Sequence, residues 1–308
     1  MEITQSALAL FFRQADLRFG QALTATKPWW SEVADLMPSG TRENVYGWLA
    51  KIPQMRKWVG PRVVNALATH AVTVRNEPWE DTIKVMEEDL RHDQYGIFNG
   101  ALKFLAAATA KWPDVMLRDL IYNNTTAGYD NKYQFATDHP TLGGDVVGPD
   151  TSTQQNYWSS GMALTSDNYA TVRAAMMSFK GEDGLPLGIT PNVLMVPPAL
   201  EQRGKLVLEA EFITGALTVT TATTSNPWYK SARLLVNPDL RSATDWFLLD
   251  TTKPVKPWIF QQEMAPRTTY IVDPTHPSVF NSREFIYGVQ AWGNVAHSLW
   301  FLSARASA

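Results

Sequence analysis

The chain has 308 residues, a hydrophobic fraction of 45% and a net charge of −3 at pH 7. This length suits one large domain or two ordinary ones with a normal core. The charge lacks the basic surplus that is typical of a dedicated nucleic-acid-binding protein. The absence of cysteine excludes disulfides and thiolate metal sites and favours an intracellular origin. No window holds the roughly 18 uncharged apolar residues that a membrane span needs.

Tryptophan is unusually frequent, with 12 residues in the chain. Large aromatic side chains dominate the energetics of both cores and interfaces, and Trp is enriched at interface hot spots. Two interpretations follow. The chain has either a Trp-rich core or a surface that is buried against other copies of itself.

The first part of the chain predicts an amphipathic arm. Residues 1–30 space their apolar side chains roughly as a helix does, and Pro28 is expected to end it. The start of the chain lacks the basic region and apolar run of a signal peptide. Residues 31–52 contain helix-like pieces, with Ser39 or Thr41 as candidate N-caps.

The next part predicts a hairpin followed by a long helix. Alternating β-branched side chains, with turn residues at 76–78, predict a long hairpin over residues 63–85. The spacing then changes to that of an amphipathic helix over residues 86–112, with acidic residues in its first turn. Pro113 is expected to interrupt this helix, and residues 114–122 continue as a second helical stretch.

The remaining residues predict a mixture of helices and strands. Residues 123–160 are polar and rich in turn formers, which predicts loops with short strands. Helices are expected over residues 167–180 and 199–212. Strands are expected over residues 192–198, 217–224 (as an edge strand or exposed loop), 231–240, 245–251, 268–272 and 284–303. The order of elements is an α+β pattern with extended appendages.

Catalytic and metal-binding motifs are scarce in the sequence. It has no P-loop, no GxSxG nucleophile turn and no HExxH motif. Asp130, Asp138 and His139 are the best candidates for a carboxylate–His site, although such residues in a loop usually form turns and local caps. His92 lies four residues after Glu88 and could share a metal with it, but a solvated charge pair is more common. No cofactor is expected.

The segment YGWLAKIPQMRKWVGPR, residues 46–62, combines aromatic and basic side chains in a stretch that fits neither a helix nor a clean strand. One interpretation is contact with phosphate and stacking on single-stranded bases. Ion pairs and cation–π contacts between subunits explain the same residues better. The basic side chains in this segment are Lys51, Arg56, Lys57 and Arg62.

Several blocks of the chain, over about residues 28–252 and in the same order, resemble the major head subunit of Mu-like transposable phages and prophages. The most specific is the IP-x-MR-x-W-x-G-x-R core of the segment at 46–62. The family's usual glycine after Tyr-Asp is Asn131 here, and Asn tolerates the left-handed conformation best after Gly. The other blocks are NEPWEDTIKV, EEDLRHDQYGIF, YDNKYQFATDHP, LMVPPALE, NPWYKSARLLVNPDL and DWFLLD.

The resemblance implies the Hong Kong 97 capsid fold of tailed phages, an α+β fold with peripheral and axial domains. Its long spine helix would lie within residues 86–122, and its extended E-loop hairpin would reach over the neighbouring subunit. The implied layout is an N-terminal arm at 1–45, the E-loop at 46–85, the peripheral domain at 86–149, the axial domain at 150–252 and a return to the peripheral domain at 253–308.

The resemblance also implies the function of a major capsid protein, with no enzymatic activity. Such a protein self-assembles into pentamers and hexamers of an icosahedral shell that encloses double-stranded DNA. The alternatives are a minor virion or tail structural protein, and a hydrolase that uses Asp138 and His139. An isolated hairpin is marginal in water, so we expect a neighbouring subunit to cover it. The predicted interface residues are Trp48, Met55, Arg56, Lys57, Trp58, Arg62 and Trp79.

The expected partners follow from the same resemblance. Because the sequence begins at Met1, we expect no lost scaffolding segment, and a separate scaffold protein to guide assembly. A portal is a further expected partner, decoration proteins are left open, and no membrane is involved. The acidic net charge suits weak, non-specific contact with packaged DNA. Assembly is expected in the host cytoplasm, and the product is the virion capsid. An isopeptide cross-link through Lys51 or Lys57 has no particular Asn partner in the sequence.

Overall fold

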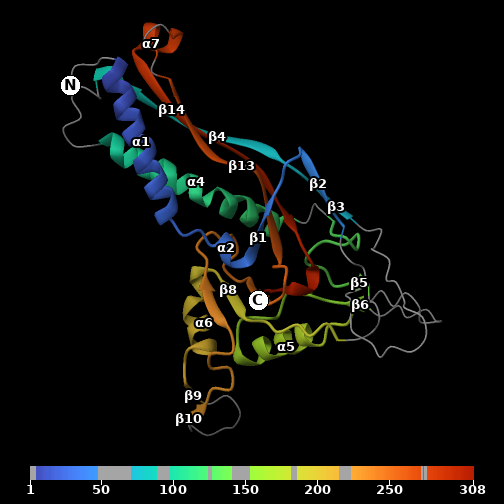
Figure 1. The fold of residues 1–308 in the computed structure, drawn as a ribbon. Helices are drawn as coiled ribbons and strands as arrows, with labels where there is room; N and C mark the ends of the chain where they lie inside the picture. Colours follow the sequence, from blue (N-terminus) through green and yellow to red (C-terminus); the bar gives the residue numbers. More distant parts are fainter. Residues whose placement is uncertain are drawn as a thin grey trace.

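Two larger sheets and the helices packed on them organise the chain in the computed structural model (Figure 1). The structure describes residues 5–47, 71–88, 97–123, 127–140, 153–181, 186–214, 223–271, 273 and 276–308. A four-stranded sheet with long strands forms the elongated part, and a five-stranded sheet forms the rounder part.

The four-stranded sheet is built around one long antiparallel pair, with α7 (Pro277–Ser282) at the turn between its strands. A parallel strand is added on one side and an antiparallel strand on the other. In spatial order, the strands are β1 (Ala34–Pro38), β13 (Trp258–Ile271), β14 (Glu284–His297) and β4 (Glu77–Met86).

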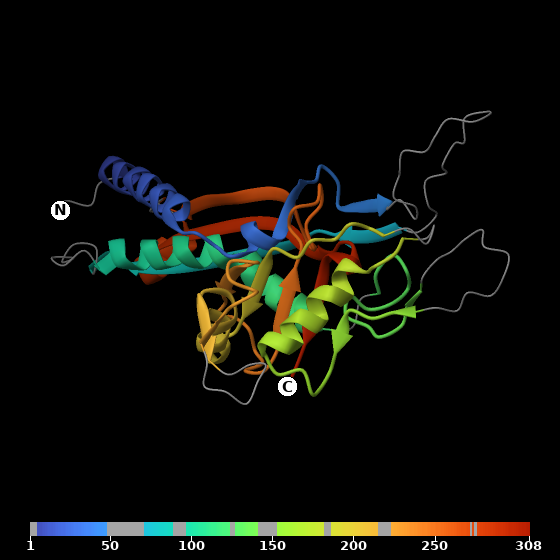
Figure 2. The same ribbon diagram turned by 90° about the horizontal axis from the view of Figure 1, so that it is seen from below.

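Two helices cover one face of this sheet, α1 (Gln5–Ala25) and α4 (Ile97–Tyr122). Every second side chain of β14 faces them, as in Phe285, Tyr287 and Val289, which are all buried. The side chains between them point to the other face of the sheet. Buried and less buried residues therefore alternate along most of the strand. Figure 2 shows the helices and the long strands from below.

The five-stranded sheet is buried on both faces, which explains the unbroken apolar runs VLMV and WFLL in its central strands. One face packs against α5 (Ser166–Met177) and α6 (Glu201–Leu208), and the other packs against the end of α4. In spatial order, the strands are β11 (Arg233–Val236), β8 (Val193–Val196), β12 (Trp246–Leu249), β15 (Ser303–Ala306) and β7 (Tyr157–Trp158).

The smaller elements join these parts. They are α2 (Trp30–Val33), the pair β2 (Glu43–Gly47) and β3 (Ala71–Arg75), the pair β5 (His139–Pro140) and β6 (Thr153–Gln154), the pair β9 (Phe212–Thr214) and β10 (Thr223–Ser225), and the 3-10 turns η1 (Pro198–Leu200) and η2 (Trp300–Leu302).

The interruption expected at Pro113 is wrong, because α4 runs through it. Proline removes one intrahelical hydrogen bond and usually kinks or ends a helix. Here the apolar side chains before and after it, such as Leu105 and Leu117, are both buried. Packing on both sides therefore outweighs the local preference. Residues 89–96, in the first part of the predicted helix, lie outside the described residues.

The hairpin expected over residues 63–85 is also wrong in its described part. β3 pairs with β2, whereas β4 pairs with β14. Asn76, between them, donates from its side chain to the Thr41 carbonyl at 2.8 Å and so attaches to another turn. Alternating residues on both sides of a short break predict two strands, but they do not show whether the strands pair with each other.

The helical pieces expected within residues 31–52 are largely wrong, because only α2 is helical in the described part. Parallel pairing of β1 with β13 extends the chain directly afterwards. Ser39 donates to the carbonyl of Thr41 at 2.8 Å in the turn after β1 rather than capping a helix. The helices expected over residues 167–180 and 199–212 are confirmed, with shorter bounds, as α5 and α6.

We predict that Phe12→Ala releases α1 from the sheet. Phe12 is fully buried and stacks on Tyr270 at 5.1 Å, and truncation of such a side chain typically costs about 3–5 kcal/mol. Hydrogen exchange of the α1 amides should accelerate strongly. Phe104→Ala is the matched control, because Phe104 is 80% exposed on α4. Equal protection of α1 in both variants would contradict this packing.

Candidate functional site

The β2–β3 stem is attached to the four-stranded sheet by buried polar groups. The hydroxyl of Tyr46 donates to Oε1 of Gln261 at 2.8 Å, and Nε2 of Gln261 donates to the carbonyl of Val74 at 3.1 Å and to Oδ1 of Asn76 at 2.7 Å. Gln261 is fully buried. Because buried polar groups are costly unless they are paired, these bonds fix the direction of the stem.

The stem ends where its strands leave the described residues. β2 ends at Gly47, which pairs with Ala71 at the start of β3. Residues 48–70 connect the two strands at this end of the stem, and the stem's end lies at the far side of the molecule from α1 (Figure 2). These residues contain most of the segment at 46–62 that the sequence singles out.

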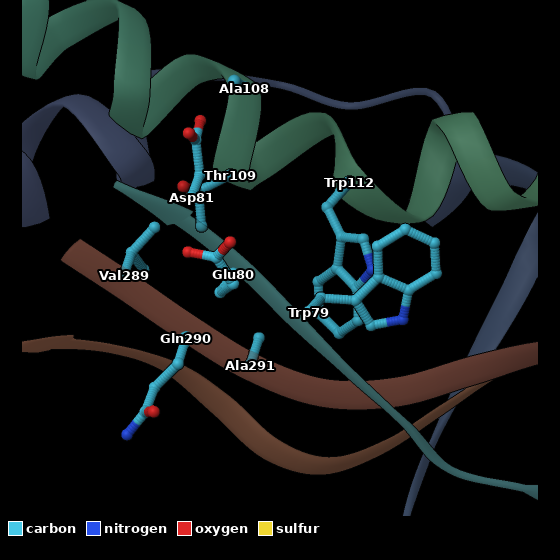
Figure 3. Close-up of a pocket in the computed structure, with 9 residues that line it drawn as sticks. All are labelled: Trp79, Glu80, Asp81, Ala108, Thr109, Trp112, Val289, Gln290 and Ala291. Carbon is cyan, nitrogen blue, oxygen red and sulfur yellow. The ribbon is translucent and has the colours of Figure 1, made fainter. Parts of the chain in front are cut away.

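A small pocket lies between α4 and the strands β4 and β14 (Figure 3). Its volume is about 110 Å³. The indole rings of Trp79 and Trp112 lie side by side at one end, with centroids 6.3 Å apart, and the carboxylates of Glu80 and Asp81 lie nearby. Trp79 is 38% exposed. The pocket is therefore apolar on one side and acidic on the other.

Large apolar side chains are exposed on several elements of the described chain. Phe104 on α4 is 80% exposed and Phe280 on α7 is 78% exposed. Scattered exposed apolar residues are normal, whereas exposed apolar side chains that gather into large patches mark interfaces. Others of this kind are Leu10, Leu17, Leu36, Val45, Trp292 and Phe212.

The segment after α1 is anchored by two carboxylates. The backbone N–H groups of Trp29 and Trp30 donate to Asp114 at 3.3 and 2.7 Å, and Nε1 of Trp29 donates to Asp239 at 2.9 Å. Burial raises the pKa of Asp114 to about 6, although the two backbone N–H groups stabilise its charged form. This anchor joins the N-terminal segment to α4 and to the loop after β11.

The structure brings together only two members of the carboxylate–His candidate. Nδ1 of His139 lies 2.6 Å from Asp130, and the ring is fully buried. Asp138 is bonded to neither of them and instead forms a hydrogen-bonded ion pair with Lys132, which lowers the pKa of Asp138. A hydrolase would need a histidine nitrogen that can reach substrate. This geometry gives that function no support.

The other ring nitrogen of His139 is held by Asn156, at 3.1 Å. The side-chain amide of Asn156 donates to the carbonyls of Gln134, Trp300 and Ser303, so its oxygen must face the histidine. Asn156 is fully buried. The group therefore ties the loop before β5 to the C-terminal strand β15, which is a structural role.

No group of three or more metal-ligating side chains is found within the described ranges. The proposed pair of Glu88 with His92 is not tested, because His92 lies outside those ranges. Nor does any helix among the described residues have the length and apolar character needed to cross a bilayer.

Of the predicted interface residues, Trp79 is the one that the structure describes. The six others lie in residues 48–70, outside the described residues, so their role stays a prediction: Trp48, Met55, Arg56, Lys57, Trp58 and Arg62. The sequence missed the partner of Trp79. Trp112 appears in the sequence only as one apolar position of a helix, and nothing in its spacing points to a strand far away in the sheet.

Comparison with known families decides what this arrangement belongs to. The family described as "Mu-like prophage major head subunit gpT" matches residues 8–160, 147–240 and 239–308. The chain belongs to this family. It is therefore a major capsid protein of the Mu-like phages and prophages, and the alternative of a minor virion or tail protein is set aside.

Two relatives share this assignment. The chain is 23% identical to the "Mu-like prophage FluMu major head subunit" of Haemophilus influenzae, over 97% of this chain and 72% of the relative. It is also 23% identical to the major capsid protein of Escherichia phage Mu, over 62% of this chain and 85% of the relative.

A solved structure shows the same fold. The procapsid of bacteriophage JBD30 matches with a TM-score of 0.60 and 22% identity, over 99% of this chain and 76% of that chain. The predicted Hong Kong 97 capsid fold is confirmed. Proteins of this fold assemble into multimeric capsid shells, and the head subunit is a component of the virion.

We predict that Asp114→Asn changes how the stability of the head subunit depends on pH. The pKa of Asp114 is raised from an ordinary value of 3.8 to about 6, so the folded state holds this proton more tightly than the unfolded state. Its contribution to stability is fully present below about pH 3.8 and is lost as the pH rises through about 6. The unfolding midpoint of the wild type, relative to Asp114→Asn, should therefore fall over this range.

The comparison with Asp114→Asn removes the opposite effect of His297. Burial lowers the pKa of His297 to about 4, and that favours the folded state as the pH rises. Both proteins carry His297, so its effect cancels in the difference between them. A difference in midpoint that is constant across this pH range would contradict the burial of an ionisable Asp114.

Proposed function

We propose that this head subunit builds an icosahedral shell of hexamers and pentamers around double-stranded DNA. Rings of five and six need heterologous contacts, in which different patches of identical subunits meet. The exposed apolar side chains on α1, α4 and α7 suit such contacts, since they come from three different elements. Each contact then contributes modestly, and a subunit is held on several sides.

The β2–β3 stem is the observation that carries this proposal. Its strands pair from Glu43↔Arg75 to Gly47↔Ala71, and residues 48–70 connect the two strands at that end. Residues 48–70 combine two Trp side chains with four Lys and Arg side chains, a composition that suits contact with a neighbouring subunit. A neighbouring subunit that covers these residues would bury apolar area worth about 25 cal/mol per Å².

The domain layout is proposed with one change. Residues 43–75 form the E-loop and its stem, since β4 belongs to the four-stranded sheet. The rest of the proposed layout is the arm before the stem, the peripheral domain with α4 as its spine helix, the axial domain at about 150–252 and the return to the peripheral domain at 253–308.

The partners are a separate scaffold protein during assembly, a portal at one vertex and the packaged DNA. The net charge of −3 supports weak, non-specific DNA contact, because a strongly basic wall would retain a polyanion that must leave. Assembly in the host cytoplasm, a shell without enzymatic turnover and the absence of a cofactor belong to the same proposal.

Charge reversal in the segment tests the proposal. The chain is expressed with its scaffold protein, and the yield of particles is measured by sedimentation and electron microscopy. Arg56→Glu with Lys57→Glu should lower the yield at least about tenfold, which corresponds to about 1.4 kcal/mol. The reason is that like charges would then meet at the contact between neighbouring subunits.

The matched control is Arg203→Glu with Lys230→Glu, which makes the same charge change at two exposed positions of the rounder part. Particle yield should stay close to that of the wild type. If the two double variants lose assembly equally, overall charge rather than the segment is responsible, and the proposed role of residues 48–70 is wrong.

A further inference from the structure

The side-chain amide of Asn156 is held in one orientation by groups whose hydrogen-bonding roles cannot change. Its nitrogen faces the carbonyl oxygens of Gln134, Trp300 and Ser303 at 2.7, 3.1 and 3.1 Å, and a carbonyl can only accept. Its oxygen lies 3.0 Å from the backbone N–H of Ala136, and that group can only donate. Contacts on both sides of the amide therefore fix its oxygen as an acceptor.

Both ring nitrogens of His139 consequently face acceptors. Nε2 lies 3.1 Å from the side-chain oxygen of Asn156, so Nε2 must carry a hydrogen. Nδ1 lies 2.6 Å from Oδ2 of Asp130, whose other oxygen accepts the backbone N–H of Lys132 at 3.1 Å. A neutral imidazole has only one N–H, so it would turn a lone pair toward one of these oxygens. Because a carboxyl group is ordinarily a stronger acid than an imidazolium, the second proton belongs on the ring.

The indole of Trp300 also favours a charged ring. The imidazole of His139 lies parallel to it, with centroids 4.1 Å apart and an angle of 4° between the planes. A cation over the face of a Trp ring is stabilised, and more strongly where water is excluded. The His139 side chain is fully buried, and that of Asp130 is 2% exposed. A buried charge is costly unless it is paired and hydrogen-bonded, and this one has both a counter-ion and an aromatic face.

The other charged groups around the ring have counter-ions of their own. Asp138, the residue before the histidine, forms an ion pair with Lys132. Arg305, on the C-terminal strand β15, pairs with Asp245 at 2.6 Å. The carboxylate of Asp130 is therefore the group that balances the charge of the imidazolium. Neutral side chains contribute the rest of this environment, and they include Gln134, Gln154, Asn156, Trp300 and Ser303.

We propose that His139 is held as a buried imidazolium, and that its second proton fastens the turn at 127–133 to the C-terminal strand β15. Asp130 lies in that turn, which the bridge Ala127↔Tyr133 closes. The backbone carbonyl of Asn156 accepts from the backbone N–H of Arg305 at 2.8 Å, so the ring links the turn to β15 through Asn156. Loss of the proton at alkaline pH turns a ring lone pair toward an acceptor and breaks this link.

NMR of the unassembled full chain with isotope-labelled histidine tests the charge directly. At about pH 7.5, an ordinary histidine with a pKa of about 6.5 is mostly neutral, whereas His139 should show two protonated ring nitrogens. A sample of His139→Gln identifies its signals by their loss. A single protonated ring nitrogen in the wild type would overturn the proposal.

The variant Asp130→Asn tests the source of the charge. An Asn side chain can donate to Nδ1, so His139 should become neutral, with its hydrogen on Nε2. The matched control is Asp138→Asn, which makes the same change at a half-exposed carboxylate bonded to Lys132. There, both ring nitrogens should stay protonated. If the two variants leave His139 in the same protonation state, the pairing with Asp130 does not hold its proton, and the proposal is wrong.

The dependence of stability on pH gives a second readout. Folding keeps on His139 a proton that an unfolded histidine releases above about pH 6.5, so the contribution of the pair is fully present below that pH and is lost as the pH rises. The unfolding midpoint of the wild type, relative to Asp130→Asn, should fall above about pH 6.5, whereas relative to Asp138→Asn it should stay nearly constant. A difference from Asp130→Asn that is constant or grows would contradict the proposal. If Asp130→Asn does not fold, the ring signals of the wild type decide.

Discussion

The packing of α4 against both sheets is the contact on which the rest of this head subunit depends. Its C-terminal half places Trp112, Met116 and Leu117 in one core with the central strands of both sheets. Because α4 continues through Pro113, one uninterrupted helix contacts both sheets and fixes their relative position. In the same region of α4, Asp114 accepts hydrogen bonds from the segment after α1. This region also forms one wall of the Trp79 pocket. Changes in the orientation of α4 would therefore reach the arm, the pocket and both sheets at once.

A single chain leaves its extended elements only partly covered. The body of the subunit has well-packed cores, yet Phe104, Phe280 and Leu17 remain exposed, and the acidic residues of β4 form no ion pair within the described residues. This arrangement suits a shell protein, because the cores stabilise each folded subunit and the extended elements contact other subunits. Because the binding energy is distributed over several modest contacts, the same subunit can also occupy rings of different size.

Local patterns predicted the elements of this fold better than their pairing. The sequence predicts strands β8 and β12 from their unbroken apolar runs, and it predicts helices α5 and α6 from the spacing of their apolar residues. Burial on one or both faces determines the composition of these elements. The partner of β3 could not, since its alternation of Val72 and Val74 fits pairing with β2 as well as with β4. The break predicted at Pro113 was wrong for a related reason. The local preference of proline disfavours a helix there, but the packing of α4 in two cores outweighs that preference. At the site, the family resemblance singled out Trp79, but Trp112 meets it only through the fold.

The central claim is that subunits of this chain complete their packing on each other through residues 48–70. A three-dimensional electron-microscopy reconstruction of particles assembled from the full chain and its scaffold tests it most directly. The account predicts a closed shell in which residues 48–70 of one subunit lie against the next subunit. A reconstruction or solution structure in which residues 48–70 pack only on their own subunit would contradict it.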